Sequence, residues 1–405
     1  MLRLLWARLT AELMNKHFAA NFFNLLIVLL IGLSGLVYWA KAEFYKAGPL
    51  ENAIFIEVPR GGTVHGLSKE LEAKGAVTYS RIMAVGSDYT KKSQQLKFGN
   101  YEIPAKASMA EILEIVTKGG RSSFRYVARY NVRIASPAKM TLRERSADEG
   151  ENVILASFVA GEELPKAYVD LKAAKTPISY QISVAEGTTS WQVVEALNAA
   201  DFLEGALLEI PAEGSLAPDT IEVRMGSLRT DIIARMKLAQ SEILKEAWAG
   251  RADNLPFKSP KEALIMASIV EKETGIKSER AEVAGVFVNR LNKGMKLQTD
   301  PTVIYGITEG KAALGRGLRR SELSKKTAYN TYIIPALPPG PIANPGRKAI
   351  EAVMQPATTD NLYFVADGTG GHVFAPSLRK HNANVIKWRK IEAKRRKAKK
   401  AAGNN

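Results

Sequence analysis

Hydrophobic and polar residues divide the chain into a long uncharged run, a segment of short strands and helices, and a C-terminal part of helices and loops. Residues 18–40 carry no charge and end near the aromatic pair Tyr38 and Trp39. About 20 apolar residues suffice to cross a bilayer as a helix. Aromatic side chains collect at the membrane interface. The pattern therefore predicts one transmembrane helix over residues 18–40.

The charges before this run predict its orientation. Three basic residues and one acid precede it, namely Arg3, Arg8, Lys16 and Glu12. Basic residues favour the cytoplasmic side, so residues 1–17 are expected in the cytoplasm. A cleaved signal peptide would have a shorter apolar core followed by small residues. We expect an uncleaved, single-pass anchor in the inner (cytoplasmic) membrane, with the rest of the chain in the periplasm.

Two stretches of the exported part share a strand, a glycine turn and a helix. Residues 56–64 are echoed at residues 182–190, with Thr63 and Thr189 placed to cap the helix that follows. A further strand at 99–103 and a helix at 109–117 would complete a small module over residues 50–121. Such a unit binds cell-wall glycan in some proteins and serves only for packing in others, and both interpretations stay open.

Residues 122–178 fit neither copy and are treated as an insertion of uncertain order, with a strand expected over 124–134.

The net charge is +16, and residues 387–400 hold nine Lys and Arg against one acid. This basic tail, residues 387–405, is typical of a solvated helix end or of a contact with anionic lipid or wall polymer. No nucleic-acid-binding motif accompanies it, so nucleic acid is not expected as a partner.

A helix that begins near Pro260 carries an apolar stripe that ends in a carboxyl group. Met266, Ile269, Val270 and Glu273 follow the i, i+3, i+4, i+7 spacing of one helical face. Desolvation raises the pKa of a carboxyl group, and a group protonated near neutral pH can act as a general acid. Glu271 lies about 200° around the helix, so Glu273 is the better candidate. A solvated helix end would show the same run of charges.

Four segments after this helix are rich in amides, hydroxyls and tyrosines. Side chains of these kinds hydrogen-bond sugar hydroxyls and stack on pyranose rings. The absence of cysteine excludes disulfides and thiol catalysis, and the four histidines have no metal-ligand spacing. We expect no metal. The candidate substrate-binding residues are Glu271, Asn289, Arg290, Gln298, Thr299, Asp300, Tyr305, Tyr329, Asn330, Thr331, Tyr332 and His372.

The string Ala-Ser-Ile-Val-Glu-Lys-Glu-Thr-Gly at residues 267–275, with these four segments, resembles the endolytic murein transglycosylases, the YceG-like family. The resemblance covers roughly residues 50–385. It implies an α+β fold with a single N-terminal transmembrane helix, a LysM-like βα module at 50–121, and an α+β catalytic domain at 179–386 with its core at 229–386. The family's catalytic glutamate aligns with Glu273. One departure is Ala217-Pro-Asp-Thr-Ile221, where the family usually has an aromatic-rich element.

The resemblance also implies an activity. It is a lytic cleavage of the β-1,4 bond between N-acetylmuramic acid and N-acetylglucosamine, giving 1,6-anhydro ends without any cofactor. Expected partners are peptidoglycan glycan strands, the inner membrane and peptidoglycan synthases. Two alternatives stay open. In a muramidase, Asp300 or Glu271 would activate water; in a non-catalytic glycan-binding scaffold, Glu273 would be inert.

Overall fold

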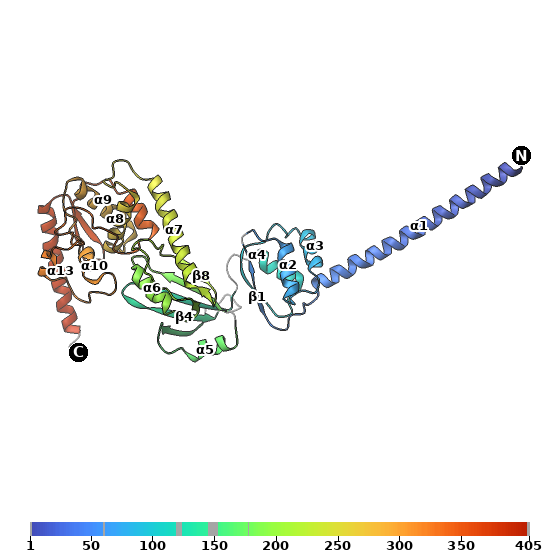
Figure 1. Cartoon of the computed structure of the whole chain (residues 1–405), viewed down its shortest axis with the longest axis horizontal. Helices are drawn as coiled ribbons and strands as arrows, with labels where there is room; N and C mark the ends of the chain where they lie inside the picture. The colour runs from blue at the N-terminus through green and yellow to red at the C-terminus, as the bar shows by residue number, and fades with distance from the viewer. Residues whose placement is uncertain (1, 60, 119–123, 145–152, 177, 403–405) are drawn as a thin grey trace. The chain divides into compact units, whose positions relative to one another are not determined.

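The computed structural model describes residues 2–59, 61–118, 124–144, 153–176 and 178–402 (Figure 1). These residues form two compact units, Met1–Arg125 and Tyr126–Asn405. Both units combine helices and strands, which confirms the α+β fold class.

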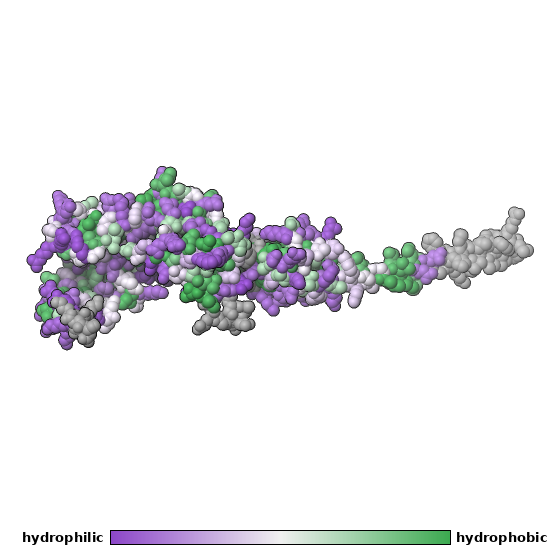
Figure 2. All heavy atoms as spheres, turned by 90° about the horizontal axis from the view of Figure 1, so that it is seen from below, coloured by the Kyte–Doolittle hydropathy of each residue, from purple (hydrophilic) through white to green (hydrophobic). Residues whose placement is uncertain are grey.

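The first unit begins with a single long helix, α1 (Leu2–Tyr45). Within it, Asn21–Tyr45 is long and apolar enough to cross a membrane, and none of its most apolar window is buried. Figure 2 shows the hydrophobic band on the described side chains of this helix. By length and composition this helix could be a membrane span or a signal sequence.

The rest of the first unit is a small module of two strands and three helices. Strand β1 (Ile54–Val58) pairs antiparallel with β2 (Gly99–Ile103). The helices are α2 (Val64–Ala73), α3 (Ser80–Tyr89) and α4 (Met109–Lys118). Thr63 caps α2 by accepting a hydrogen bond from the Gly66 amide, as predicted, because its side chain satisfies one of the free amides of the first turn. The predicted strand at 99–103 and helix near 109–117 are confirmed.

The second unit contains a five-stranded sheet in the order β5-β4-β3-β6-β8. Within this sheet the β3–β6 pair is parallel and the three other pairs are antiparallel. The strands are β3 (Tyr126–Arg133), β4 (Ser136–Glu144), β5 (Val153–Val159), β6 (Ile178–Val184) and β8 (Thr220–Val223). Three of these strands come from the segment predicted as an insertion, so its described part is ordered and shares a sheet with the strand that follows it. The predicted strand over 124–134 is confirmed.

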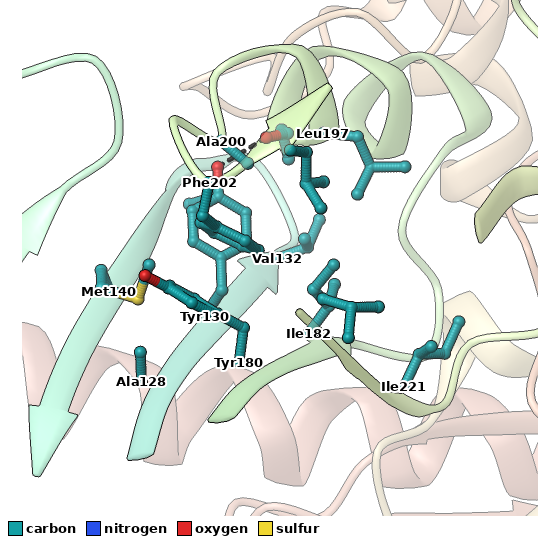
Figure 3. Close-up of a cluster of buried hydrophobic side chains, with 14 of the residues drawn as sticks. Ala128, Tyr130, Val132, Met140, Tyr180, Ile182, Leu197, Ala200, Phe202 and Ile221 are labelled. Atoms are coloured by element: carbon teal, nitrogen blue, oxygen red, sulfur yellow. Dashed lines mark hydrogen bonds between the residues drawn. The ribbon is translucent and has the colours of Figure 1, made fainter. Parts of the chain in front are cut away.

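Helix α6 (Ser190–Asn198) packs on this sheet through a core of aliphatic and aromatic residues (Figure 3). The ring of Tyr180 stacks on Phe202 with centroids 4.3 Å apart. The buried hydroxyl of Tyr130 donates to the Ala196 carbonyl, which ties the sheet to α6. Thr189 forms a full capping box at the start of α6, so the strand, turn and helix of the second copy are confirmed. Helix α5 (Lys166–Ala173) and the short strand β7 (Leu203–Glu204) add Tyr168 and Leu203 to this core, and β7 pairs with β9 (Ser227–Leu228).

The remainder of the second unit is mainly helical, and α8 (Pro260–Glu273) lies at its centre. Helix α8 begins at Pro260, as predicted, and Ser259 caps it by accepting a hydrogen bond from the Glu262 amide. Residues 368–371 form the turn of a hairpin, and the basic tail continues a helix. The other elements are α7 (Arg229–Ala249), η1 (Lys277–Glu279), α9 (Arg280–Asn292), α10 (Asp300–Thr308), α11 (Arg320–Ser324), α12 (Arg347–Met354), β10 (Tyr363–Ala366), β11 (His372–Ala375) and α13 (Leu378–Ala402).

Candidate active site

Glu273 is the last residue of α8 and continues its buried stripe. Met266, Ile269 and Val270 are completely buried, as the spacing predicts. Thr274 leaves the helix with φ −136° and ψ 129°, so α8 ends at the carboxyl group. Glu273 lines a cleft of about 170 Å³. The other lining residues are Phe287, Arg290, Leu297, Gln298, Asp300, Tyr332 and Phe364.

The surroundings of Glu273 keep its carboxyl group protonated at a higher pH than usual. Burial raises its pKa, and the negative charge of Asp300 adds to the effect. A hydrogen bond donated by the Thr299 hydroxyl to Oε1 opposes it, as do the charges of His372 and Arg290. Among the described residues, Oε2 has no hydrogen-bond partner. One carboxyl oxygen is thus held by the protein, while the other is available to a ligand.

Glu271 is placed differently, although it lies only two residues away. Its Oε1 pairs with Nη2 of Arg280 at 3.0 Å, and its Oε2 accepts from the Gly346 amide at 3.0 Å. Its side chain is only 4% exposed. Burial raises the pKa of Glu271 as well, against the pull of these two partners. The pKa direction therefore does not separate the two glutamates, whereas access to the cleft does.

Several candidates from the sequence meet around the cleft. Tyr332 donates from its hydroxyl to Oδ1 of Asp300 at 2.7 Å. Arg290 donates to the carbonyls of Leu297 at 2.6 Å and Leu362 at 2.7 Å, so its guanidinium also holds the walls of the cleft together. Gln298 lies at the rim with φ 51°.

The remaining candidates do not line this cleft in the described structure, and most of them bond to the backbone. Asn330 is fully buried and donates to three carbonyls, the closest being that of Lys325 at 2.7 Å. Asn289 donates to the carbonyls of Thr359 and Asn361. The buried hydroxyl of Thr331 accepts from the Thr299 amide at 3.0 Å, which fixes the residue that contacts Glu273.

Two aromatic candidates and the histidine form contacts beside the cleft. The rings of Tyr305 and Tyr329 lie 5.0 Å apart, and the Tyr305 hydroxyl donates to Glu213 at 3.3 Å. Nδ1 of His372 lies 2.8 Å from Oε2 of Glu279.

Three apolar lining residues were not among the candidates, namely Phe287, Leu297 and Phe364. Phe287 precedes Arg290 by three positions on α9, so the helical spacing could have placed both on one face. Phe364 packs edge-on against Phe287 with centroids 5.7 Å apart. Nothing local in the sequence marks that pairing, since Phe287 and Phe364 lie 77 positions apart in the chain.

No group of three or more metal-ligating side chains suited to a metal ion occurs among the described residues. The fold and the cleft together define an α+β protein whose candidate active site has one buried, accessible carboxyl group.

Comparison with known proteins identifies the family. The model of the YceG-like family matches residues 56–387. Two endolytic murein transglycosylases of Streptococcus pneumoniae, from strains D39 and R6, are each 27% identical over 355 residues, which is 82% of this chain and 58% of theirs. The endolytic murein transglycosylase of Bacillus subtilis strain 168 is 29% identical over 326 residues, covering 71% of this chain and 84% of its own.

This chain belongs to the YceG-like family, and the resemblance seen in the sequence is confirmed. It spans 58% of the length of the two Streptococcus relatives. A crystal structure of a YceG-like protein from Listeria monocytogenes aligns with a TM-score of 0.43 at 23% identity, covering 82% of this chain and 99% of that one.

Proposed function

We propose that this protein is an endolytic peptidoglycan lytic transglycosylase, with Glu273 as its catalytic acid and base. It would cleave the β-1,4 bond between N-acetylmuramic acid and N-acetylglucosamine in nascent strands and so end their elongation. The observation that carries the proposal is the Glu273 carboxyl group, which lines the cleft, has its pKa raised by burial, and has no hydrogen-bond partner for Oε2 among the described residues. The names of the relatives support the same activity.

The geometry around Glu273 suits a reaction with a single carboxyl group. Because Thr299 donates to Oε1, the carboxyl proton is expected on Oε2, facing the bond to be cleaved. Glu273 gives this proton to the glycosidic oxygen as the bond from the anomeric carbon breaks. The resulting carboxylate then takes the proton of the muramic acid 6-hydroxyl, whose oxygen bonds to the anomeric carbon. A 1,6-anhydro ring forms, Glu273 is protonated again, and no water is consumed.

The developing positive charge on the sugar needs oxygens nearby. Asp300 and Tyr332, which are joined by a hydrogen bond at the cleft, are placed to supply them. Gln298 and Arg290 would contact hydroxyl or acetamido groups. Asn289, Asn330 and Thr331 would act indirectly, by holding the backbone that carries these residues.

Hydrolysis is the competing chemistry, because Asp300 lines the same cleft as Glu273. A glycosidase of the usual two-carboxylate kind needs a second acid to act on water or on the sugar. Mass spectrometry of the fragments released from purified peptidoglycan separates the two reactions. We expect anhydro-muramyl ends. Fragments heavier by one water would instead identify a muramidase, and no release would favour a binding scaffold.

The pH dependence of kcat/KM is expected to follow Glu273. Activity requires its protonated form, so kcat/KM falls as the pH rises through its pKa. Asp300→Asn removes a negative charge that raises this pKa, and the fall should move to lower pH. Thr299→Val removes a hydrogen-bond donor that lowers the pKa of Glu273, so the fall in kcat/KM should move to higher pH. A shift of both variants in the same direction would exclude Glu273 as the titrating group.

We further propose that α1 anchors the protein in the cytoplasmic membrane with its N-terminus inside and the catalytic unit outside. The exposed apolar run Asn21–Tyr45 supports the anchor, and the flanking charges support the orientation. Protease added to intact spheroplasts should then degrade the second unit. Protection of the second unit from protease would instead indicate the opposite orientation.

The βα module at residues 50–121 is proposed as a LysM-like glycan-binding unit. A hollow of about 320 Å³ supports this role, lying between the turn before α2 and the end of α3. Sedimentation of the full chain with insoluble wall should weaken when a bulky Thr63→Trp substitution narrows the hollow.

Peptidoglycan synthases are proposed as partners because the nascent strands they make are the expected substrate, and co-purification after cross-linking would test this.

A further inference from the structure

The second unit contains a larger hollow that the proposed chemistry does not use. It has a volume of about 410 Å³ and lies between the turn joining β3 to β4, the outer face of α6 and the segment Lys311–Ala313. We call it the α6 groove. Its floor and walls are rich in alanine, with Ala138 and Ala196 buried beneath it. Small side chains here leave an open trough where larger ones would fill it.

One aromatic and several polar side chains line the α6 groove. Trp191 is partly exposed, and among the described residues its indole has neither a hydrogen-bond partner nor a ring partner. Glu195, one turn further along α6, is exposed and also lacks a side-chain partner in the described structure. Lys311, on the opposite wall, pairs only with the exposed Glu309. A flat aromatic face with free donors and acceptors at its edge is the lining that a sugar ring requires.

Helix α10 connects the α6 groove to the catalytic cleft. Asp300, its first residue, lines the cleft. Lys311, three positions after its last residue, lines the groove. Nine helical residues span about 13 Å at about 1.5 Å each, a length that a few linked sugars can cover.

The start of α6 and the end of α10 are in direct contact. The Thr189 hydroxyl, at the start of α6, donates to the Gly310 carbonyl at 2.7 Å. Gly310 has φ 72°, and a Cβ at this position would lie 2.8 Å from Thr189 and 3.0 Å from Tyr305. The cap residue of α6 and a side chain of α10 therefore both pack against this glycine, which joins the wall of the groove to the helix that begins at Asp300.

We propose that the α6 groove is an accessory glycan subsite, which holds N-acetylated sugars of the same strand several residues away from the bond cleaved at Glu273. The inference rests on the proposed function for its substrate class. Such a subsite would make the enzyme select long strands, because only these reach both the cleft and Trp191. Short fragments would bind in the cleft but would not reach the α6 groove.

The test compares kcat/KM of the full-length protein in detergent on peptide-free glycan strands and on the shortest fragments that it cleaves. Trp191→Ala should lower kcat/KM about five- to tenfold on long strands, mainly through KM, and leave short fragments unaffected. Ala312→Arg keeps Trp191 but fills the groove from an exposed position, and it should have the same effect. Trp248→Ala is the matched control, since Trp248 packs on Arg251 and does not line the groove.

Binding in a Glu273→Gln background keeps the inference testable without cleavage. Calorimetry should show that Trp191→Ala weakens the affinity for long strands and not for short fragments. Equal effects on both lengths, or none with either groove variant, would overturn the subsite. So would competition by free stem peptide and not by glycan, which would assign the groove to peptide. Failure of the wild type to form anhydro ends would refute the proposed activity alone.

Discussion

Glu273→Gln is expected to lower kcat/KM on peptidoglycan by about 10³-fold or more, because one group serves both as acid and as base. The amide matches the carboxyl group in shape, and its oxygen can still accept the hydrogen bond from Thr299. Its amide N–H is far too weakly acidic to protonate the glycosidic oxygen, and its nitrogen cannot act as the base. Release of anhydro-muramyl fragments, followed by mass spectrometry under initial-rate conditions, measures the loss.

The same substitution should not destabilise the fold. A carboxyl group whose pKa is raised by burial costs stability once the pH exceeds its unfolded value, because ionisation then favours the unfolded chain. Glutamine avoids that cost, so the unfolding free energy of Glu273→Gln at neutral pH should equal or exceed that of the wild type. Activity retained within tenfold would refute the role of Glu273 and favour the scaffold alternative.

Elements with a strong local signal could be predicted from the sequence. The apolar stripe of α8 and its start at Ser259 and Pro260 follow from periodicity and capping, and both are present. The two Thr-capped helices follow from the same chemistry. The sheet of the second unit could not be predicted, because the parallel pairing of β3 with β6 joins strands separated by two other strands and a helix. No short-range pattern encodes such a pairing.

The candidate site shows the same limit. The position of Glu273 was predictable because a carboxyl group on a buried stripe has a physical consequence that spacing reveals. The roles of Asn289 and Asn330 were not, because an amide that would suit a sugar also suits backbone carbonyls. For Asn289 the partner carbonyls, those of Thr359 and Asn361, lie 70 or more residues further along the chain.

Glu271→Ala is expected to lower the unfolding free energy by about 3 kcal/mol, because it breaks a buried ion pair. The Arg280 side chain is 6% exposed, and its Nε and Nη1 already lack partners in the described structure. Without Glu271, the Arg280 guanidinium would keep Glu186 as its acidic partner, and the Gly346 amide would lose its acceptor. Urea unfolding at an unchanged m-value measures the loss.

The matched control is Glu351→Ala, which breaks an exposed pair with Lys348 and should change stability by about 0.5 kcal/mol or less. Glu271→Gln keeps one acceptor oxygen and puts an amide nitrogen, which cannot accept, at the other position, so its loss of stability should fall between the two. Since both oxygens of Glu271 are bound within the protein, kcat/KM per folded molecule should stay within about threefold of the wild type in Glu271→Gln. A stable Glu271→Gln protein that has lost activity as fully as Glu273→Gln would instead show that Glu271 takes part in the chemistry, as a second carboxyl group does in a hydrolase.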